Sequence, residues 1–183
     1  CLTRPIFMDA LMIGLIVGGF ILLIFGFWFF STWNRLVRLE ENANKSWADI
    51  DVLLKQRYDM IPNLVNIVKG YAEHEREIFE QFALARQTAA GCLAQGDVKG
   101  VGAAEGMLSG LMPKINMVAE QYPDLKADTS FVNLQNQLVA LENQLADRRE
   151  FYNASSTNFN SAIQMIPTNF VAATKGCTRK DLF

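Results

Sequence analysis

The sequence has few of the histidine and cysteine residues that metal sites and many hydrolases need. Its 183 residues include one histidine, His74, and three cysteines. His74 is flanked by Glu73 and Glu75, whose side chains would point about 100° away from it on a helix. The cysteines form no CxxC pair, and no second histidine completes a metal motif. The sequence therefore predicts no metal ligand, no cofactor and no catalytic residue.

Basic clusters, nucleophile–base pairs and phosphate-binding loops are also missing. The formal net charge is −2, and no run of lysine and arginine is dense enough to follow a phosphate backbone. Ser155, Ser156 and Thr157 lack a plausible histidine or lysine base. No glycine-rich fingerprint follows a strand, because strand signals are absent. We expect no nucleic-acid partner and no enzyme activity; a hydrolase with an unrecognised site stays open as an alternative.

One feature is present in full: an unbroken apolar run over residues 10–30, without a charged or amide side chain. A helix that rises about 1.5 Å per residue would cover roughly 30 Å over this run, the thickness of a bilayer's hydrocarbon core. The residues that follow make a poor signal-peptide cleavage site. The run predicts a single transmembrane helix at residues 10–30, preceded by a short segment at residues 1–9.

The basic residues that flank the run are unequal in number. Arg4 precedes it, whereas Arg35, Arg38 and Lys45 follow it. Under the positive-inside rule this difference places the bulk of the chain in the cytoplasm. A periplasmic or extracellular domain stays open, because two glutamates lie among the basic residues. Acylation of Cys1, as in a lipoprotein, is an alternative anchor that a full span would make redundant.

Small and aromatic residues lie at defined places in and after the run. Gly14 and Gly18 form a GxxxG pair that Gly19 extends, and small residues let two helices approach closely in lipid. Trp28 and Trp33 belong to an aromatic cluster at the downstream end, as in an interfacial belt. We therefore expect a homo-oligomer in the lipid bilayer, with contact of the glycines to a different membrane protein as the alternative.

Apolar or small residues recur after the run at spacings of three and four. This eleven-residue repeat, about 3.67 residues per turn, predicts a helix that is nearly straight or coils slightly to the right. Pro62 predicts a kink near residues 60–63, or a short break with Pro62 opening the next helix. The members of the repeat are Leu36, Leu39, Ala43, Trp47, Ile50, Leu54, Tyr58, Ile61 and Val65.

The rest of the chain also reads as helices joined by turns. The next helix is predicted to stop at Gly91, and a glycine-rich loop then leads into a weaker helix that ends at residue 122. Residues 124–129 are expected to form a loop, with residue 128, 129 or 130 as the N-cap. A seven-residue repeat over residues 131–162 predicts a last helix that Pro167 closes. The predicted fold is all-α, an N-terminal transmembrane helix followed by a long antiparallel helical bundle.

Charged side chains gather on the first helix after the span. Asp51 and Lys55 have the spacing and orientation of a favourable i, i+4 ion pair. The group is interpreted either as a solvated face with internal ion pairs or as a surface for partner recognition or self-assembly. Its members are Asp49, Asp51, Lys55, Arg57 and Asp59.

Several segments carry specific motifs. Residues 44–75 read NKSWADIDVLLKQRYDMIPNLVNIVKGYAEHE, residues 122–127 read YPDLKA, and residues 141–149 read LENQLADRR. Together with the pairs Tyr-Asn at 152–153, Phe-Asn at 159–160 and Ile-Pro at 166–167, they resemble the motifs of the LemA family of bacterial membrane proteins. The resemblance assigns residues 31–169 to a LemA-like bundle. Residues 170–183 form a C-terminal tail that departs from the family's usual aromatic-rich, glycine-containing ending.

The resemblance implies a location in the inner membrane of a bacterium and no particular reaction. Members of the family are associated with membrane proteases of the HtpX type and with envelope stress, without a settled activity. We therefore expect a membrane-anchored helical scaffold or adaptor that assembles with itself in bacterial envelope maintenance or stress. The alternatives are an accessory component or partner of a membrane protease system, or the hydrolase mentioned above.

Overall fold

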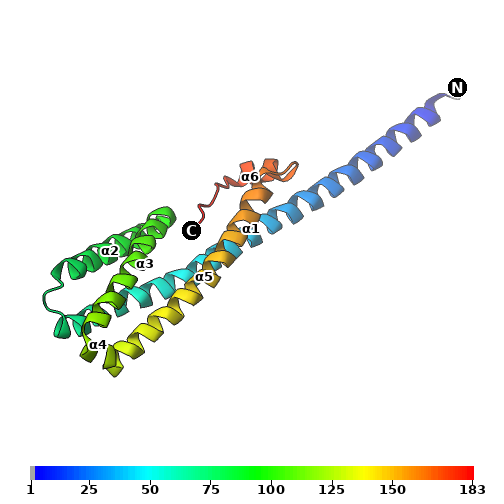
Figure 1. Cartoon of the computed structure of the whole chain (residues 1–183). Coiled ribbons are helices and arrows are strands. Elements are labelled where there is room, and N and C mark those ends of the chain that lie inside the picture. The colour runs from blue at the N-terminus through cyan, green and yellow to red at the C-terminus, as the bar shows by residue number, and fades with distance from the viewer. Residues whose placement is uncertain (1–2) are drawn as a thin grey trace. The chain divides into compact units, whose positions relative to one another are not determined.

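The computed structural model describes residues 3–183, with side chains from residue 12 onward, and Cys1, whose acylation is the alternative anchor, lies outside the described residues. The described chain is helical and contains no strand, which confirms the predicted all-α fold (Figure 1). The helices are α1 (Thr3–Tyr71), α2 (Arg76–Gln95), α3 (Val98–Gln121), α4 (Pro123–Ala127), α5 (Thr129–Gln164) and α6 (Thr168–Lys175).

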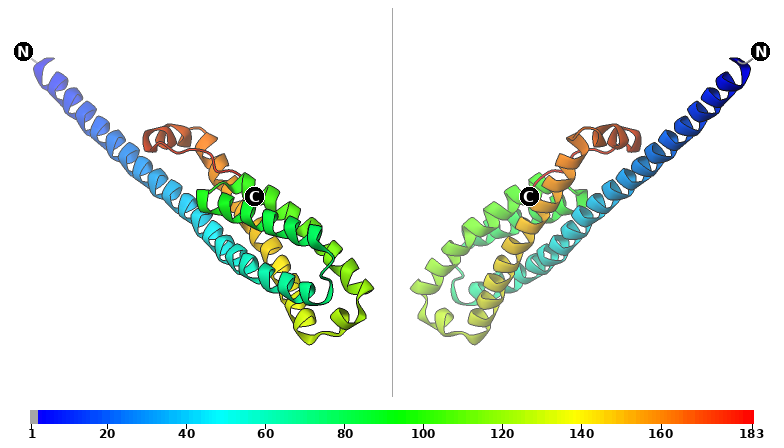
Figure 2. Two further views of the ribbon diagram at one scale, coloured as in Figure 1. Left: turned by 90° about the vertical axis from the view of Figure 1, so that its left-hand side faces the viewer. Right: turned by 90° about the vertical axis from the view of Figure 1, so that its right-hand side faces the viewer.

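The chain divides into two compact units, and both α1 and α5 contribute to each of them. Unit 1 contains Cys1–Glu41 and Asn158–Arg179, and unit 2 contains Asn42–Thr157 and Lys180–Phe183. In unit 2, α2 and α3 form an antiparallel hairpin joined by a short turn (Figure 2). The α1 and α5 segments are also antiparallel, because Trp47 contacts Tyr152 whereas Arg57, further along α1, contacts Glu142.

The core of unit 2 follows from the apolar stripes of its helices. Each helix buries the side chains that recur every three or four residues, as an amphipathic helix does against its neighbours. The predicted repeat on α1 is confirmed in both units. In unit 2 Ala43, Ile50, Leu54, Tyr58 and Ile61 are buried and Trp47 and Val65 are half-buried, and in unit 1 Leu36 is buried and Leu39 is half-buried. The largest fully buried side chains from the other helices of unit 2 are Phe82, Leu108, Ile115, Leu125, Phe131, Leu145 and Glu105.

One of the two alternatives predicted at Pro62, a break in the helix, is wrong, and so is the predicted helix end at Gly91. Pro62 lies inside α1, which continues to Tyr71, so the chain does not break there. Gly91 lies inside α2, which ends instead at Gly96, where φ is 71°. A glycine within a helix costs only about 1 kcal/mol, which tertiary packing can offset. Gly96 adopts the left-handed conformation that lets a helix close on its last carbonyls, and its N–H donates to Leu93 O at 3.1 Å.

The turns between the later helices also differ in detail. The loop expected at residues 124–129 contains the short helix α4, with Pro123 in its first turn. Asp128 caps α5, because its Oδ1 accepts from the N–H groups of Ser130 at 2.7 Å and Phe131 at 3.0 Å. α5 ends at Gln164, shortly before Pro167 as predicted, and the chain then forms α6, which the sequence analysis did not predict.

Unit 1 contains the apolar run. α1 is the one helix of the described chain that is long and apolar enough to cross a membrane, and none of its most apolar stretch is buried. This fits a single-pass membrane protein. Further along unit 1, a small cluster buries Leu36 of α1 with Ala162 of α5 and with Val171 and Ala172 of α6.

Candidate functional site

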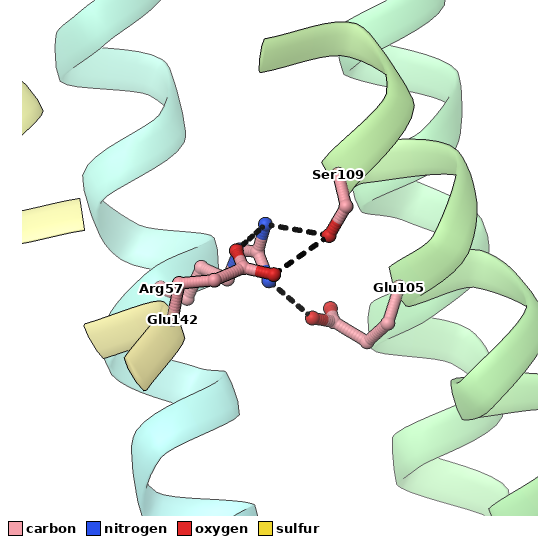
Figure 3. Close-up of polar contacts among 4 residues, drawn as sticks. All are labelled: Arg57, Glu105, Ser109 and Glu142. Carbon is pink, nitrogen blue, oxygen red and sulfur yellow. Dashed lines mark hydrogen bonds and ion pairs between the residues drawn. The ribbon is translucent and has the colours of Figure 1, made fainter. Parts of the chain in front are cut away.

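A buried arginine joins three helices of unit 2. Arg57 of α1 lies 2.6 Å from Glu105 Oε2 of α3 through Nη1, and 2.8 Å from Glu142 Oε2 of α5 through Nη2. The Ser109 hydroxyl, on α3, donates to Glu142 Oε1 at 3.0 Å and accepts from Arg57 Nη2 at 3.4 Å (Figure 3). We call these four residues the Arg57 cluster.

Helical spacing places Arg57 and Glu105 on the buried faces of their helices. Arg57 follows Leu54 by three residues and precedes Ile61 by four, so it shares their face of α1. Glu105 has the same place on α3, four residues after Val101 and three before Leu108. The sequence analysis missed Glu105, Ser109 and Glu142, and the signal that could have found Glu105 is a charged residue in register with an apolar stripe.

Burial is unequal within the cluster. The Arg57 and Glu105 side chains are 4% and 1% exposed, whereas Glu142 is 47% exposed. Burial raises the pKa of Glu105, and the Arg57 guanidinium opposes that shift. Taking ions out of water costs several kcal/mol, which is offset only where the pairing geometry is good. Arg57 meets this condition because its planar fork contacts two carboxylates at once.

Two buried oxygen atoms, one in the cluster and one beside it, have no hydrogen-bond partner in the part of the chain whose side chains are described. They are the Tyr58 hydroxyl and Glu105 Oε1. Burial raises the pKa of Tyr58 and the nearby Glu105 carboxylate raises it further, so the phenol stays protonated. A protonated phenol and a carboxylate oxygen are a donor and an acceptor, and a small side-chain movement would let them satisfy each other.

The outer side of the cluster opens into a cavity of about 250 Å³ between α3 and α5. Its wall combines apolar side chains, among them Met112, Leu138 and Val139, with polar groups: Asn116 Oδ1 accepts from Gln135 Nε2 at 2.6 Å, and Ser109 and Glu142 reach the cavity from the cluster. These groups can hydrogen-bond to a solute or a peptide. Among residues 12–183, Ser109 hydrogen-bonds to Arg57 and Glu142, neither of which activates a serine as histidine or lysine does, so these residues form no nucleophile–base pair at the cavity.

The structure corrects one member of the predicted charged face. Arg57 does not lie on the exposed side of α1, because the helix turns it into the core. Asp51 and Lys55 form the predicted ion pair at 2.6 Å. Asp49 lies 3.7 Å from Arg148 of α5, and Asp59 is exposed.

Three of the remaining members border a second cavity. Asp51, Lys55 and Asp59 of α1 line a space of about 460 Å³ together with Arg86 of α2. Arg86 Nε donates to the main-chain oxygen of Tyr58 at 2.7 Å, which holds α2 to α1 at this point. The cavity therefore presents two carboxylates and two cations at the surface, an arrangement suited to charged protein partners. We call Asp51, Lys55, Asp59 and Arg86 the α1–α2 charged surface.

The residues predicted for self-association lie in unit 1. A Cβ atom built on Gly14, Gly18 or Gly19 would meet no other atom of the described chain within 4 Å, so the glycine face is free for a second helix. Trp28 lies 5.7 Å from Phe25 between ring centroids. Trp33 lies 6.1 Å from Phe29, so an aromatic cluster lies at the downstream end of the apolar run, as the sequence indicated.

The other candidate residues form no recognisable reactive group. His74 is exposed, and within residues 12–183 no three His, Cys, Asp or Glu side chains gather where they could hold a metal ion. Cys92 and Cys177 are free thiols. Burial raises the pKa of Cys177, which disfavours its reactive thiolate.

The last four described residues belong to unit 2. The Phe183 ring lies 5.6 Å from Trp47 in an edge-to-face contact, and the guanidinium of Arg149 lies 4.5 Å from its centroid. Asn153 exchanges two hydrogen bonds with the main chain of Phe183, at 2.7 and 2.8 Å. Lys99 pairs with Asp181 at 2.7 Å. The end of the predicted tail thus ties α1, α3 and α5 together.

Comparisons with known proteins give one consistent result. Residues 46–183 match the model of the LemA family. The chain is 26% identical over 175 residues to magnetosome protein MamQ 2 of Paramagnetospirillum magneticum, covering 82% of this chain and 64% of that protein. It is 23% identical over 174 residues to MamQ of Magnetospirillum gryphiswaldense, again covering 82% and 64%. It is 26% identical over 151 residues to protein LemA of Metamycoplasma hominis, covering 81% and 67%. The chain thus spans under two thirds of the length of the MamQ relatives.

Proposed function

This chain belongs to the LemA family, and from that premise we propose that it is a membrane-anchored helical scaffold or adaptor that acts in maintenance of the bacterial envelope. The observation that carries the proposal is the Arg57 cluster. Its charged groups pair with one another across three helices, so their role is to hold a bundle in one arrangement. Buried polar contacts of this kind specify register between packed helices.

The same cluster argues against catalysis. A catalytic group must meet the substrate, whereas Arg57 is occupied by Glu105 and Glu142. Ser109, the hydroxyl in the cluster, lacks a histidine or lysine base. The proposal is therefore that the protein is not an enzyme and works by binding other proteins.

Two surfaces support binding to further copies of the chain. In the span, Gly14, Gly18 and Gly19 leave one helix face without side chains, which allows close helix–helix contact in lipid. In unit 2, the α1–α2 charged surface offers both signs of charge, so two copies can pair opposite charges about a two-fold axis. We propose that the glycine face drives homo-oligomer formation and that the charged surface binds further copies of the chain or recognises partner proteins.

Native size in a mild detergent tests the assembly. The full chain is extracted and its molar mass is measured by light scattering coupled to size exclusion. We expect an oligomer for the wild type, and a smaller species for the double variant Gly14→Leu/Gly18→Leu. Gly26→Leu is the matched control, because Gly26 is also open and lies in the same apolar run. A strict monomer without any copurifying protein contradicts the scaffold.

A second experiment tests the partner surface. Lys55→Glu/Arg86→Glu reverses both cations of the α1–α2 charged surface, whereas Lys126→Glu reverses an exposed cation elsewhere in unit 2. Proteins that copurify with the wild type, including a membrane protease if one does, should be lost from the first variant alone. Retention of the same proteins by both variants contradicts recognition by this surface.

The proposed side of the membrane is the cytoplasm. The support is the excess of basic residues after the span, where Arg35 and Arg38 are exposed. The variant Leu84→Cys in a Cys1→Ser/Cys92→Ser/Cys177→Ser background provides a single thiol at an exposed site of unit 2. An impermeant maleimide should label it only after cell lysis, and labelling in intact cells would contradict the assignment.

A further inference from the structure

The turn between α5 and α6 presents large apolar side chains that nothing in the described chain covers. Ile166 is 80% exposed, Phe170 is 69% exposed and Met165 is 59% exposed. Scattered exposed apolar residues are ordinary on a protein surface, but three large ones within six residues form a patch. We call these three residues the α5–α6 apolar patch.

The place where α6 packs against α1 indicates what can cover the α5–α6 apolar patch. The buried residues of α6, Val171 and Ala172, belong to one cluster with Leu36, and Trp28 and Phe29 pack against that cluster. Trp28 and Phe29 are themselves part of the apolar run of residues 10–30. Because that run fits a membrane span, α6 is attached to α1 where the span leaves the hydrocarbon core.

Polar contacts and charge also support a position of α6 at the end of the membrane span. Lys175 pairs with Glu40, which fixes the end of α6 to α1. Outside the apolar run, residues 31–41 and 158–179 of unit 1 carry four basic and two acidic side chains, and of the basic ones Arg35, Arg38 and Arg179 are exposed. A basic surface next to an apolar patch matches an interface of anionic headgroups over acyl chains.

We propose that the α5–α6 apolar patch inserts into the bilayer that the chain's own span crosses, at the boundary between headgroups and acyl chains. The chain would then contact the membrane twice, through the span and through this turn. Insertion would remove Ile166 and Phe170 from water, which favours burial of the apolar patch at this depth. The second contact would hold unit 1 against the membrane surface.

Spin labels on the reconstituted full chain test this insertion. Nitroxides are attached at Ile166→Cys and, separately, at Phe170→Cys in a Cys1→Ser/Cys92→Ser/Cys177→Ser background, in vesicles with anionic lipid. Leu84→Cys is the exposed control in unit 2, and Leu15→Cys is the control inside the span. Circular dichroism checks that each variant keeps the helix content of the wild type.

Relaxation by oxygen, which concentrates in lipid, is compared with relaxation by a water-soluble nickel chelate. We expect the oxygen-to-nickel ratio at residues 166 and 170 to exceed that at residue 84 several-fold and to approach that at residue 15. A ratio equal to that of residue 84 overturns the proposal. Protection from both reagents with spin–spin broadening would indicate a second copy on the patch, which also overturns it. A low ratio at residue 15 would contradict the span and the insertion together.

Discussion

Arg57 Nη1 of α1 lies 2.6 Å from Glu105 Oε2 of α3, and both side chains are almost completely buried. The contact is an ion pair inside a helical core, a place where neither charge can return to water. Such a pair is a weak source of net stability and a strong constraint on arrangement. Substitutions can separate the contribution of the ion pair to stability from its effect on the arrangement of the helices.

Removing one partner should be costly. Arg57→Met leaves the buried Glu105 carboxylate without its cation, and we expect a loss of about 3–5 kcal/mol in the free energy of unfolding. The double variant Arg57→Met/Glu105→Leu should recover most of this loss, because no unpaired buried charge remains. Urea unfolding in detergent, followed by circular dichroism, measures both.

The exposed pair on the same helix is the matched control. Lys55→Met breaks the Asp51–Lys55 contact, and an exposed i, i+4 pair contributes only about 0.3–0.5 kcal/mol. A similar loss for Lys55→Met and Arg57→Met would show that the buried cluster has no special role.

The cap of α5 should make stability depend on pH. The hydrogen bond from the Tyr71 hydroxyl lowers the pKa of Asp128 below its usual 3.8, and the main-chain bond from Phe131 lowers it further. The ionised form is thus favoured in the folded state, so its stabilisation is present above pH 3.8 and is lost as the pH falls through the folded-state pKa.

Melting temperatures of wild type and Asp128→Asn measure this effect, because asparagine keeps the cap but has no charge to lose. The wild type should melt higher at pH 6, and the difference should vanish towards pH 2. Asp128→Ala should melt below both at pH 6. A constant difference between wild type and Asp128→Asn across this range would exclude the assignment.

Two glycines of α3 should respond oppositely to alanine. A Cβ at Gly100 would lie 2.2 Å from Asp97 Oδ2 and 2.8 Å from Cys92 Sγ, and Asp97 is the N-cap of the helix. Gly100→Ala should therefore destabilise the protein. Gly106 has open space around it, and Gly106→Ala should stabilise by up to about 1 kcal/mol because alanine favours the helix. Thermal unfolding compares the two, and a gain at Gly100 would contradict the close contact.

Phe183 should matter more than its neighbour in sequence. Its ring contacts Trp47 and Arg149, whereas Leu182 is exposed. We expect Phe183→Ala to lower the free energy of unfolding by about 1–2 kcal/mol through lost burial and ring contacts. Leu182→Ala should have little effect in the same urea titration, and equal losses would show that the ring contacts contribute nothing.

Most of the fold could be predicted because the spacing of apolar residues along a helix shows which side chains are buried. The residues of α1 from Leu36 to Ile61 repeat every three or four positions, and each of them turned out buried or half-buried. The boundaries of the helices were harder to predict from the sequence. Gly91 and Gly96 are the same residue type, and only the end of the packed surface decides that α2 stops at the second.

The candidate site could not be predicted for a related reason. Lys55 and Arg57 are both basic residues on one helix, and their different burial depends on what the opposite helices supply. The partners of Arg57 lie 48 and 85 positions further along the chain. No periodicity within α1 contains that information. The spacing of Arg57 from Leu54 did indicate that the two residues share the buried face of α1. The charge of Arg57 favoured an exposed position instead, and the prediction followed the charge.

The three tryptophans divide between the two units. Trp28 and Trp33 belong to unit 1, and Trp47 belongs to unit 2, where its ring lies between Tyr152 and Phe183. Intrinsic fluorescence can therefore be separated by position. A Trp28→Phe/Trp33→Phe chain emits from the bundle alone, and a Trp47→Phe chain emits from the membrane-proximal unit alone. Two matched proteins without any attached dye would thus report whether the units unfold together or one after the other.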